Sequence, residues 1–157
     1  MLEEIEKVKD MVNDLDALYF SIFYHDIVYK PLKNNNEHKS ALIFNKNISK
    51  TRFKNIAACM QQIEATKKHE FATEKDTNIL LDLDLLVLGQ SAASYDAYAI
   101  NVRKEYQMVP TFMYNSGRKK VLEHFLNMNS IYKTAYFQNK YELNAKENLE
   151  RELRSFT

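Results

Sequence analysis

The ten residues at positions 79–88, ILLDLDLLVL, decide between an all-helical and a mixed fold. Their local alternation of apolar and acidic residues is compatible with a half-buried strand. Leucine dominates the stretch, however, β-branched residues are few, and no other segment offers a partner strand. We therefore expect a helix from about Asp76 to Leu88. Gly89 follows at the position where a glycine in the left-handed conformation commonly ends a helix.

The rest of the chain has the same helical character. Only two glycines and two prolines occur among 157 residues, which are too few for the tight turns of a sheet protein. Either Asp14 or Asp16 is the expected N-cap of the second helix. We expect an all-α fold, a single-domain helical bundle of seven or eight helices over residues 1–157. Apolar spacing and stop signals place the other helices at about 2–13, 14–29, 36–46, 51–66, 92–108, 110–128 and 135–156.

Charge, hydropathy and cysteine content argue against several classes of function. The formal net charge is +1, and the aromatic residues are not interleaved with clustered Lys and Arg, so nucleic acid is not an expected partner. No apolar run approaches the roughly 20 residues that span a bilayer, and the acidic N-terminal residues do not resemble a signal peptide. We expect no membrane partner. The one cysteine, Cys59, has no partner for an internal disulfide, which favours a reducing, cytoplasmic location.

A histidine and an aspartate, His25 and Asp26, stand side by side in the apolar segment LYFSIFYHDIVY at residues 18–29. Burying such a pair without partners costs several kcal/mol, and a metal ion is one partner that would compensate. Imidazole with carboxylate suits Mn, Fe, Co, Ni or Mg better than a closed structural zinc site. Asp82 and Asp84 could add a third ligand, but they point about 200° apart on a helix, so only one would face the site. The alternative is a hydrogen-bonded core pair, or an aspartate that reaches solvent.

Seven short motifs follow one another between residues 24 and 152, within a match that covers nearly the whole chain, from about Leu2 to Leu153. They are YHDIVY (24–29), NEHKSA (36–41), IEATKKH (63–69), LDLDLLVLG (81–89), RKEY (103–106), GR (117–118) and NLERE (148–152). In this order they resemble a bacterial branch of the HD superfamily of predicted metal-dependent phosphohydrolases. The resemblance implies an HD-domain-like, all-α fold. It also implies a metal held by an upstream histidine, a His-Asp doublet and a downstream aspartate.

By this resemblance the metal ligands are His25, Asp26 and Asp84, with Asp84 favoured over Asp82. Asp26, Glu37 and His69 are the expected catalytic residues of the same pocket. The implied cofactor is a divalent ion, and the implied substrate is a small phosphorylated metabolite or nucleotide. Such an ion would lower the pKa of a bound water toward roughly 7 and polarise a phosphoryl oxygen. The cations available to neutralise phosphate charge are Lys30, Lys33, Lys67, Lys68, Arg103 and Arg118.

The chain departs from the family pattern in ways that bear on activity. The family carries a His-bearing helix ahead of the segment that matches residues 2–9, and no histidine precedes His25 here. We therefore expect weak metal binding or none, and an apolar groove against the first two helices through which a homodimer could form. The loop is altered as well, because residues 35–38 read NNEH where the branch has Asp-Asn-Glu-Glu. The alternative function is a catalytically inactive HD-like helical protein with an interaction or regulatory role.

Overall fold

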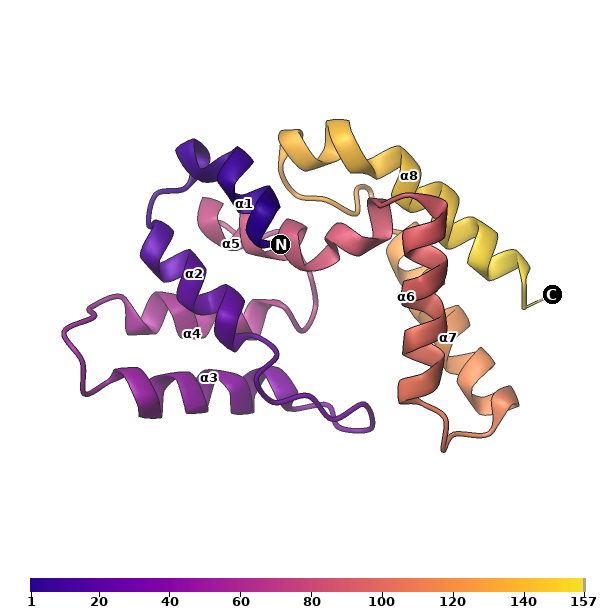
Figure 1. Cartoon of the computed structure of the whole chain (residues 1–157), viewed down its shortest axis with the longest axis horizontal. Helices are drawn as coiled ribbons and strands as arrows, with labels where there is room; N and C mark the ends of the chain where they lie inside the picture. Colours follow the sequence, from indigo (N-terminus) through magenta and orange to yellow (C-terminus); the bar gives the residue numbers. More distant parts are fainter. Residues whose placement is uncertain (157) are drawn as a thin grey trace. The chain divides into compact units, whose positions relative to one another are not determined.

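The computed structural model describes residues 1–156, which form helices joined by turns and loops (Figure 1). Eight α-helices and two 3-10 helices are found in this range, and no strand, so the predicted all-α fold is confirmed. The helices belong to two compact units, the first made of Met1–Asp84 and the second beginning at Leu85. That residues 1–157 make one HD-like domain stays a prediction.

The first unit holds a hairpin of two helices, α3 and α4, against which α2 packs (Figure 1). Its core contains Ala17, Phe44 and Ile63, and the rings of Phe20 and Phe53 pack against it. The predicted first helix is divided into α1 and η1, and α4 begins five residues later than expected. The elements are α1 (Leu2–Val8), η1 (Lys9–Met11), α2 (Leu15–Tyr24), α3 (Asn36–Ile48), α4 (Ile56–Ala65) and α5 (Lys75–Asp84).

Helix α5 is buried from residue 76 to residue 83, although half of these residues are polar, so their side chains need partners inside the fold. It contacts α2 and α4. At its first turn the carboxylate of Asp76 accepts hydrogen bonds from the backbone N–H groups of Asn13 (2.9 Å) and Asp14 (2.8 Å). Asp14 in turn caps α2, because its Oδ1 accepts from the N–H of Ala17 at 2.9 Å, so the cap is Asp14 and not Asp16. The start of α2 is thus fixed to the start of α5.

Helix α2 ends at Tyr24, well before the predicted end at Tyr29. The imidazole Nδ1 of His25 donates to the carbonyl oxygen of Ile22 at 2.7 Å. In a continuing helix that carbonyl would accept from the backbone N–H of Asp26. The side chain of His25 therefore takes the place of the next helical bond, and the His-Asp doublet lies in the turn directly after the helix.

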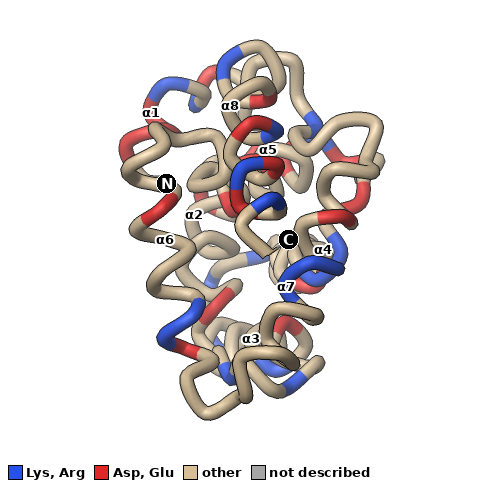
Figure 2. Tube along the Cα trace, turned by 90° about the vertical axis from the view of Figure 1, so that its right-hand side faces the viewer, with Lys and Arg blue, Asp and Glu red and all other residues tan. Residues whose placement is uncertain are grey.

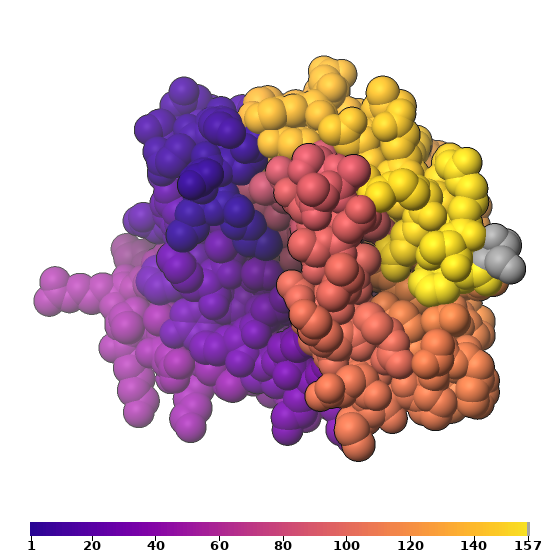
Figure 3. Space-filling view, turned by 45° about the vertical axis from the view of Figure 1, so that its right-hand side comes forward, coloured from indigo at the N-terminus to yellow at the C-terminus, as the bar shows by residue number. Residues whose placement is uncertain are grey.

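The second unit contains three α-helices that follow a short 3-10 helix. Helix α8 contacts η2 and α7, and the start of α6 lies beside α8 (Figure 3). Among the described residues of the second unit, the fully buried side chains include Tyr95, Tyr132, Phe137 and Leu122. The elements are η2 (Leu85–Gly89), α6 (Ala92–Glu105), α7 (Thr111–Leu126) and α8 (Ala135–Arg154).

Gly89 does not end its helix in the left-handed conformation, so the sequence-based explanation of this glycine is wrong. No described glycine has a positive φ. A Cβ at position 89 would lie 2.6 Å from the Cβ of Tyr141 and 2.8 Å from the carbonyl oxygen of the same residue. Glycine is required here because α8 approaches the backbone closely, and not because of φ.

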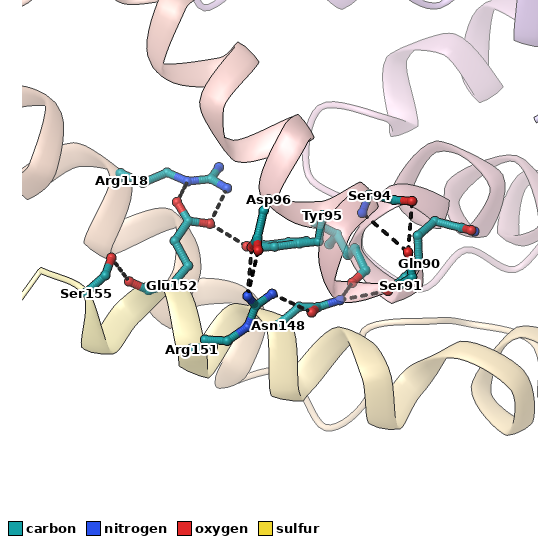
Figure 4. A network of polar contacts seen from close by, with 11 residues as sticks. Gln90, Ser91, Ser94, Tyr95, Asp96, Arg118, Asn148, Arg151, Glu152 and Ser155 are labelled. Carbon is teal, nitrogen blue, oxygen red and sulfur yellow. Dashed lines mark hydrogen bonds and ion pairs between the residues drawn. The ribbon is translucent and has the colours of Figure 1, made fainter.

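A buried polar network joins α6, α7 and α8 (Figure 4). The Arg118 guanidinium donates to both carboxylate oxygens of Glu152, each at 2.8 Å, and the hydroxyl of Tyr95 donates to the same carboxylate. Asn148 donates to the carbonyl oxygen of Leu88 at 2.9 Å. Arg118 is therefore an internal ion-pair partner. From the sequence, Arg118 was instead one of the cations expected to neutralise phosphate charge.

Acidic and basic residues are interspersed along the chain, as Figure 2 shows. This pattern agrees with the small net charge of +1. Among residues 1–156 no helix combines the length and the apolar character that crossing a bilayer requires.

Candidate metal centre

Three side chains that the sequence predicts to bind metal come together in the first unit. His25 and Asp26 belong to the turn after α2, and Asp84 is the last residue of α5. One donor atom from each lies within 4.8 Å of the other two. His25 Nε2 is 3.3 Å from Asp84 Oδ1 and 3.6 Å from Asp26 Oδ2. Two ligands of a shared ion, each about 2.1 Å from it, lie about 3.0–3.5 Å apart, so the 3.3 Å separation falls within this range and the 3.6 Å separation lies just above it.

The orientation of the His25 ring is fixed from the side away from the carboxylates. Its Nδ1 faces the carbonyl oxygen of Ile22, which can only accept a hydrogen bond, so Nδ1 carries the proton. In the neutral ring, Nε2 then presents a lone pair to the carboxylate oxygens of Asp26 and Asp84. A lone pair and two carboxylates repel one another unless a cation lies among them. The geometry therefore requires either a proton or a metal ion at this point.

The acid–base properties of the cluster follow from this arrangement. Burial alone would lower the pKa of His25, but the hydrogen bond and charge of Asp84, with the charge of Asp26, raise that pKa to about 9. Burial would likewise raise the pKa of Asp84, but hydrogen bonds with His25 and His69 hold it well below its usual range. Partial desolvation of its carboxyl group raises the pKa of Asp26, although its side chain is exposed, against the opposing charge of His25. A metal ion that binds here must displace the proton of His25.

His69 holds the second oxygen of Asp84. Its Nε2 donates to Asp84 Oδ2 at 2.8 Å, which leaves Oδ1 facing His25. The backbone of His69 has φ of 52°, in the left-handed region that costs a residue with a Cβ about 1–2 kcal/mol. This contact makes His69 a positioning residue for Asp84, in the way that outer partners orient metal ligands. A catalytic role for His69 stays a prediction.

Glu37 lies in the first turn of α3. Its Oε2 is buried and accepts no hydrogen bond from the described residues. The charge of Glu37 helps to raise the pKa of Asp26, so the two carboxylates are close to each other. Leaving a buried acceptor without a donor costs about 1–3 kcal/mol, so this oxygen is expected to meet a donor from water or from a ligand.

The other sequence candidates divide between the site and its surroundings. Asp82 is fully buried and is not a member of the cluster, so the structure brings Asp84 and not Asp82 to the doublet. Lys67 Nζ donates to the carbonyl oxygen of Asn34 at 2.6 Å and so joins the loop after α2 to the loop after α4. The exposed Lys68 is 4.0 Å from Glu70.

Two residues important for the site were missed by sequence reasoning. The carbonyl group of Ile22 orients His25, and no side-chain pattern signals a backbone acceptor. Asp76 fixes the start of α2 from the opposite end of α5, and an acid in the first turn of a buried helix is a signal that could have identified it.

Comparison of the chain with protein-family models, curated proteins and solved structures found no match. The resemblance to the HD superfamily therefore stays a prediction that rests on the sequence motifs. The geometry of the cluster is the basis for any assignment of function.

Proposed function

We propose that the first unit binds one divalent metal ion through His25, Asp26 and Asp84 and uses it to hydrolyse a phosphate monoester. The observation that carries this proposal is the His25 ring, held by Ile22 so that Nε2 faces two carboxylates. One imidazole nitrogen with two carboxylate oxygens suits Mn, Fe, Co, Ni or Mg. Three protein donors leave coordination positions for water and substrate, as in catalytic sites. With no fourth donor in the cluster among residues 1–156, we expect weak binding.

Each residue of the cluster has a distinct part in this proposal. A bound ion would supply a water with its pKa lowered toward about 7 and would polarise a phosphoryl oxygen. His69 keeps Asp84 oriented through Oδ2. Attack by a water on phosphorus would break the P–O bond to the alcohol, which would leave with a proton from solvent. We assign the acceptance of the proton from the attacking water to Glu37, because its buried Oε2 has no hydrogen-bond donor among the described residues and its charge acts on Asp26. The exposed ammonium groups of Lys30, Lys33, Lys67 and Lys68 are the cations available to neutralise phosphate charge.

Metal binding is tested by calorimetric titration with Mn²⁺ and Ni²⁺. The main variant is Asp26→Asn, because the Asp26 side chain is exposed and the change keeps its shape. His38→Gln is the matched control, since His38 is an exposed histidine paired with Glu64 at 2.8 Å. We expect binding by the natural chain and by His38→Gln, and its loss in Asp26→Asn and in Asp84→Asn. A natural chain that binds neither ion, or an Asp26→Asn variant that binds as well, contradicts the proposal.

Turnover is a separate test. Release of inorganic phosphate from p-nitrophenyl phosphate is measured with Mn²⁺ for the natural chain and for Glu37→Gln. We expect turnover that depends on the metal and falls about 100-fold or more in the variant, since general-base catalysis contributes about 10²–10⁴-fold. Metal binding without turnover of any phosphate ester would instead support the catalytically inactive protein. Sedimentation would then test self-association, including the predicted homodimer.

A further inference from the structure

Exposed apolar side chains in the first unit are concentrated on the two segments of chain that carry His25 and His69. Seven large apolar side chains are exposed between residues 1 and 84, and five of them lie on the two segments that carry His25 and His69. We call these five the apolar rim. They are Phe23, Ile27, Tyr29, Leu32 and Phe71.

Both segments contact the same carboxylate group, that of Asp84. His25 and His69 approach different oxygens of Asp84, at 3.3 Å and 2.8 Å. Ile27 follows His25 by two residues and Phe71 follows His69 by two residues. Two residues of backbone extend at most about 7 Å, so both rim residues branch from chain that lies close to the metal centre.

The segment after α2 is held in place by specific hydrogen bonds. The N–H of Val28 donates to Ser40 Oγ at 3.1 Å, and the N–H of Lys30 donates to Asn36 Oδ1 at 3.2 Å. The Asn36 amide donates back to the Lys30 carbonyl oxygen at 3.0 Å. This segment therefore presents its apolar side chains to solvent from an ordered backbone, as a recognition surface does.

Cations stand among the rim residues. Lys30 and Lys33 are exposed and flank Leu32, whose side chain is 73% exposed. On the other segment Lys67, which donates to the carbonyl oxygen of Asn34, and Lys68, which is 4.0 Å from the exposed Glu70, precede Phe71, which is 74% exposed. Apolar area beside positive charge complements a ligand that is anionic at one end and apolar at the other.

From this juxtaposition we infer that the substrate is a phosphate monoester of an apolar alcohol, aryl or alkyl, whose apolar part contacts Ile27 and Phe71. The inference rests on the proposed phosphohydrolase function and specifies its substrate class. Burial of one such side chain against a ligand is worth about tenfold in affinity. A phosphate of a hydrophilic alcohol would gain nothing from the rim.

The test compares esters that differ only in the alcohol. The kcat/KM values for 1-naphthyl phosphate and hexyl phosphate are measured with Mn²⁺ against that for glycerol phosphate. We expect at least one apolar ester to be preferred about tenfold or more. If naphthyl phosphate alone is preferred the rim takes aryl groups, and if hexyl phosphate is preferred as well it takes alkyl chains. Equal kcat/KM for all three overturns the inference and leaves the proposed function standing.

Single substitutions then test which residues produce the preference for apolar esters. Ile27→Ala and Phe71→Ala are expected to raise KM for the preferred ester about five- to tenfold, with kcat and the constants for glycerol phosphate unchanged. The matched control is Leu42→Ala, because Leu42 is an exposed leucine (48%) on α3 outside the rim. If the rim variants alter self-association and not KM, the rim is a protein interface and the inference is wrong. Absence of turnover with every ester overturns the proposed function and this inference together.

Discussion

Replacing Gly89 by alanine tests how closely η2 approaches α8 in the second unit. The added Cβ would lie 2.6 Å from the Cβ of Tyr141, 2.8 Å from its carbonyl oxygen and 2.7 Å from the hydroxyl oxygen of Tyr132. Carbon atoms in contact are normally about 3.5–4.0 Å apart, so the two elements must separate by about 1 Å. Two of the three atoms are fixed to the backbone of α8, and rotation of a side chain cannot relieve the clash.

The expected cost follows from these contacts. Overpacking a core costs about 1–3 kcal/mol, and the involvement of backbone favours the upper half of that range. Alanine returns about 0.4–1 kcal/mol because it restricts the unfolded chain more than glycine does. We expect a net loss of about 2 kcal/mol. In a chain of this size that corresponds to a fall in Tm of about 4–8 °C.

Thermal unfolding followed by circular dichroism measures this loss, and the only other glycine of the chain provides the control. A Cβ at Gly117, inside α7, meets nothing within 4 Å. Gly117→Ala should therefore stabilise the protein by about 0.5–1 kcal/mol, because alanine favours helix over glycine. A Gly89→Ala variant with the Tm of the natural chain, or a shift of the same sign in both variants, would refute the packing argument.

Three further results are expected. Glu152→Gln should destabilise the protein by about 3–5 kcal/mol in urea unfolding, because it leaves the buried charge of Arg118 without its partner. The control is Glu150→Gln on the exposed face of α8, which should cost less than about 0.5 kcal/mol. Burial would raise the pKa of Glu142, but the backbone N–H groups that donate to its carboxylate lower that pKa. The contribution of Glu142 to stability is therefore present above pH 4.5 and is lost as pH falls through the lowered pKa. In Glu142→Gln, the acid side of a curve of stability against pH should be shallower. His69→Gln should weaken Mn²⁺ binding about 10- to 100-fold by calorimetry, and an unchanged affinity would show that this histidine does not position the metal ligands.

Composition and apolar spacing were sufficient to predict the helical fold. The stretch at 79–88, which decided the matter, is α-helical as far as Asp84 and continues as the 3-10 helix η2. The leucine-rich composition was therefore a better guide than the local alternation. The end of α2 could not be predicted in the same way, because it depends on a bond from the His25 ring to a carbonyl of the preceding turn. The reason for Gly89 was also inaccessible, since α8 lies more than forty residues later in the chain.

The sequence predicted which residues belong to the candidate site better than it predicted how these residues are held in place. The His25-Asp26 doublet stood out because two ionisable groups interrupt an apolar segment, and the resemblance to HD phosphohydrolases favoured Asp84 over Asp82. The structure adds information about contacts between side chains that the residue types alone do not contain. It shows that His69 bonds to Asp84 at 2.8 Å and that Glu37 keeps a buried oxygen without a donor. His69 lies in the loop after α4 and Glu37 in the first turn of α3, so both facts depend on how separate segments of the chain pack together.

The same contacts that build the first unit also orient its candidate ligands. Asp76 at the start of α5 holds the start of α2, and Asp84 at the end of α5 meets His25 just beyond the end of α2. The two helices are therefore joined at both ends, and the His25 ring is further fixed by Ile22. None of these bonds needs a metal ion, in contrast to a structural zinc site whose fold depends on the ion. An ion would thus enter a site already formed by the protein, and its binding energy would not be consumed in ordering the ligands.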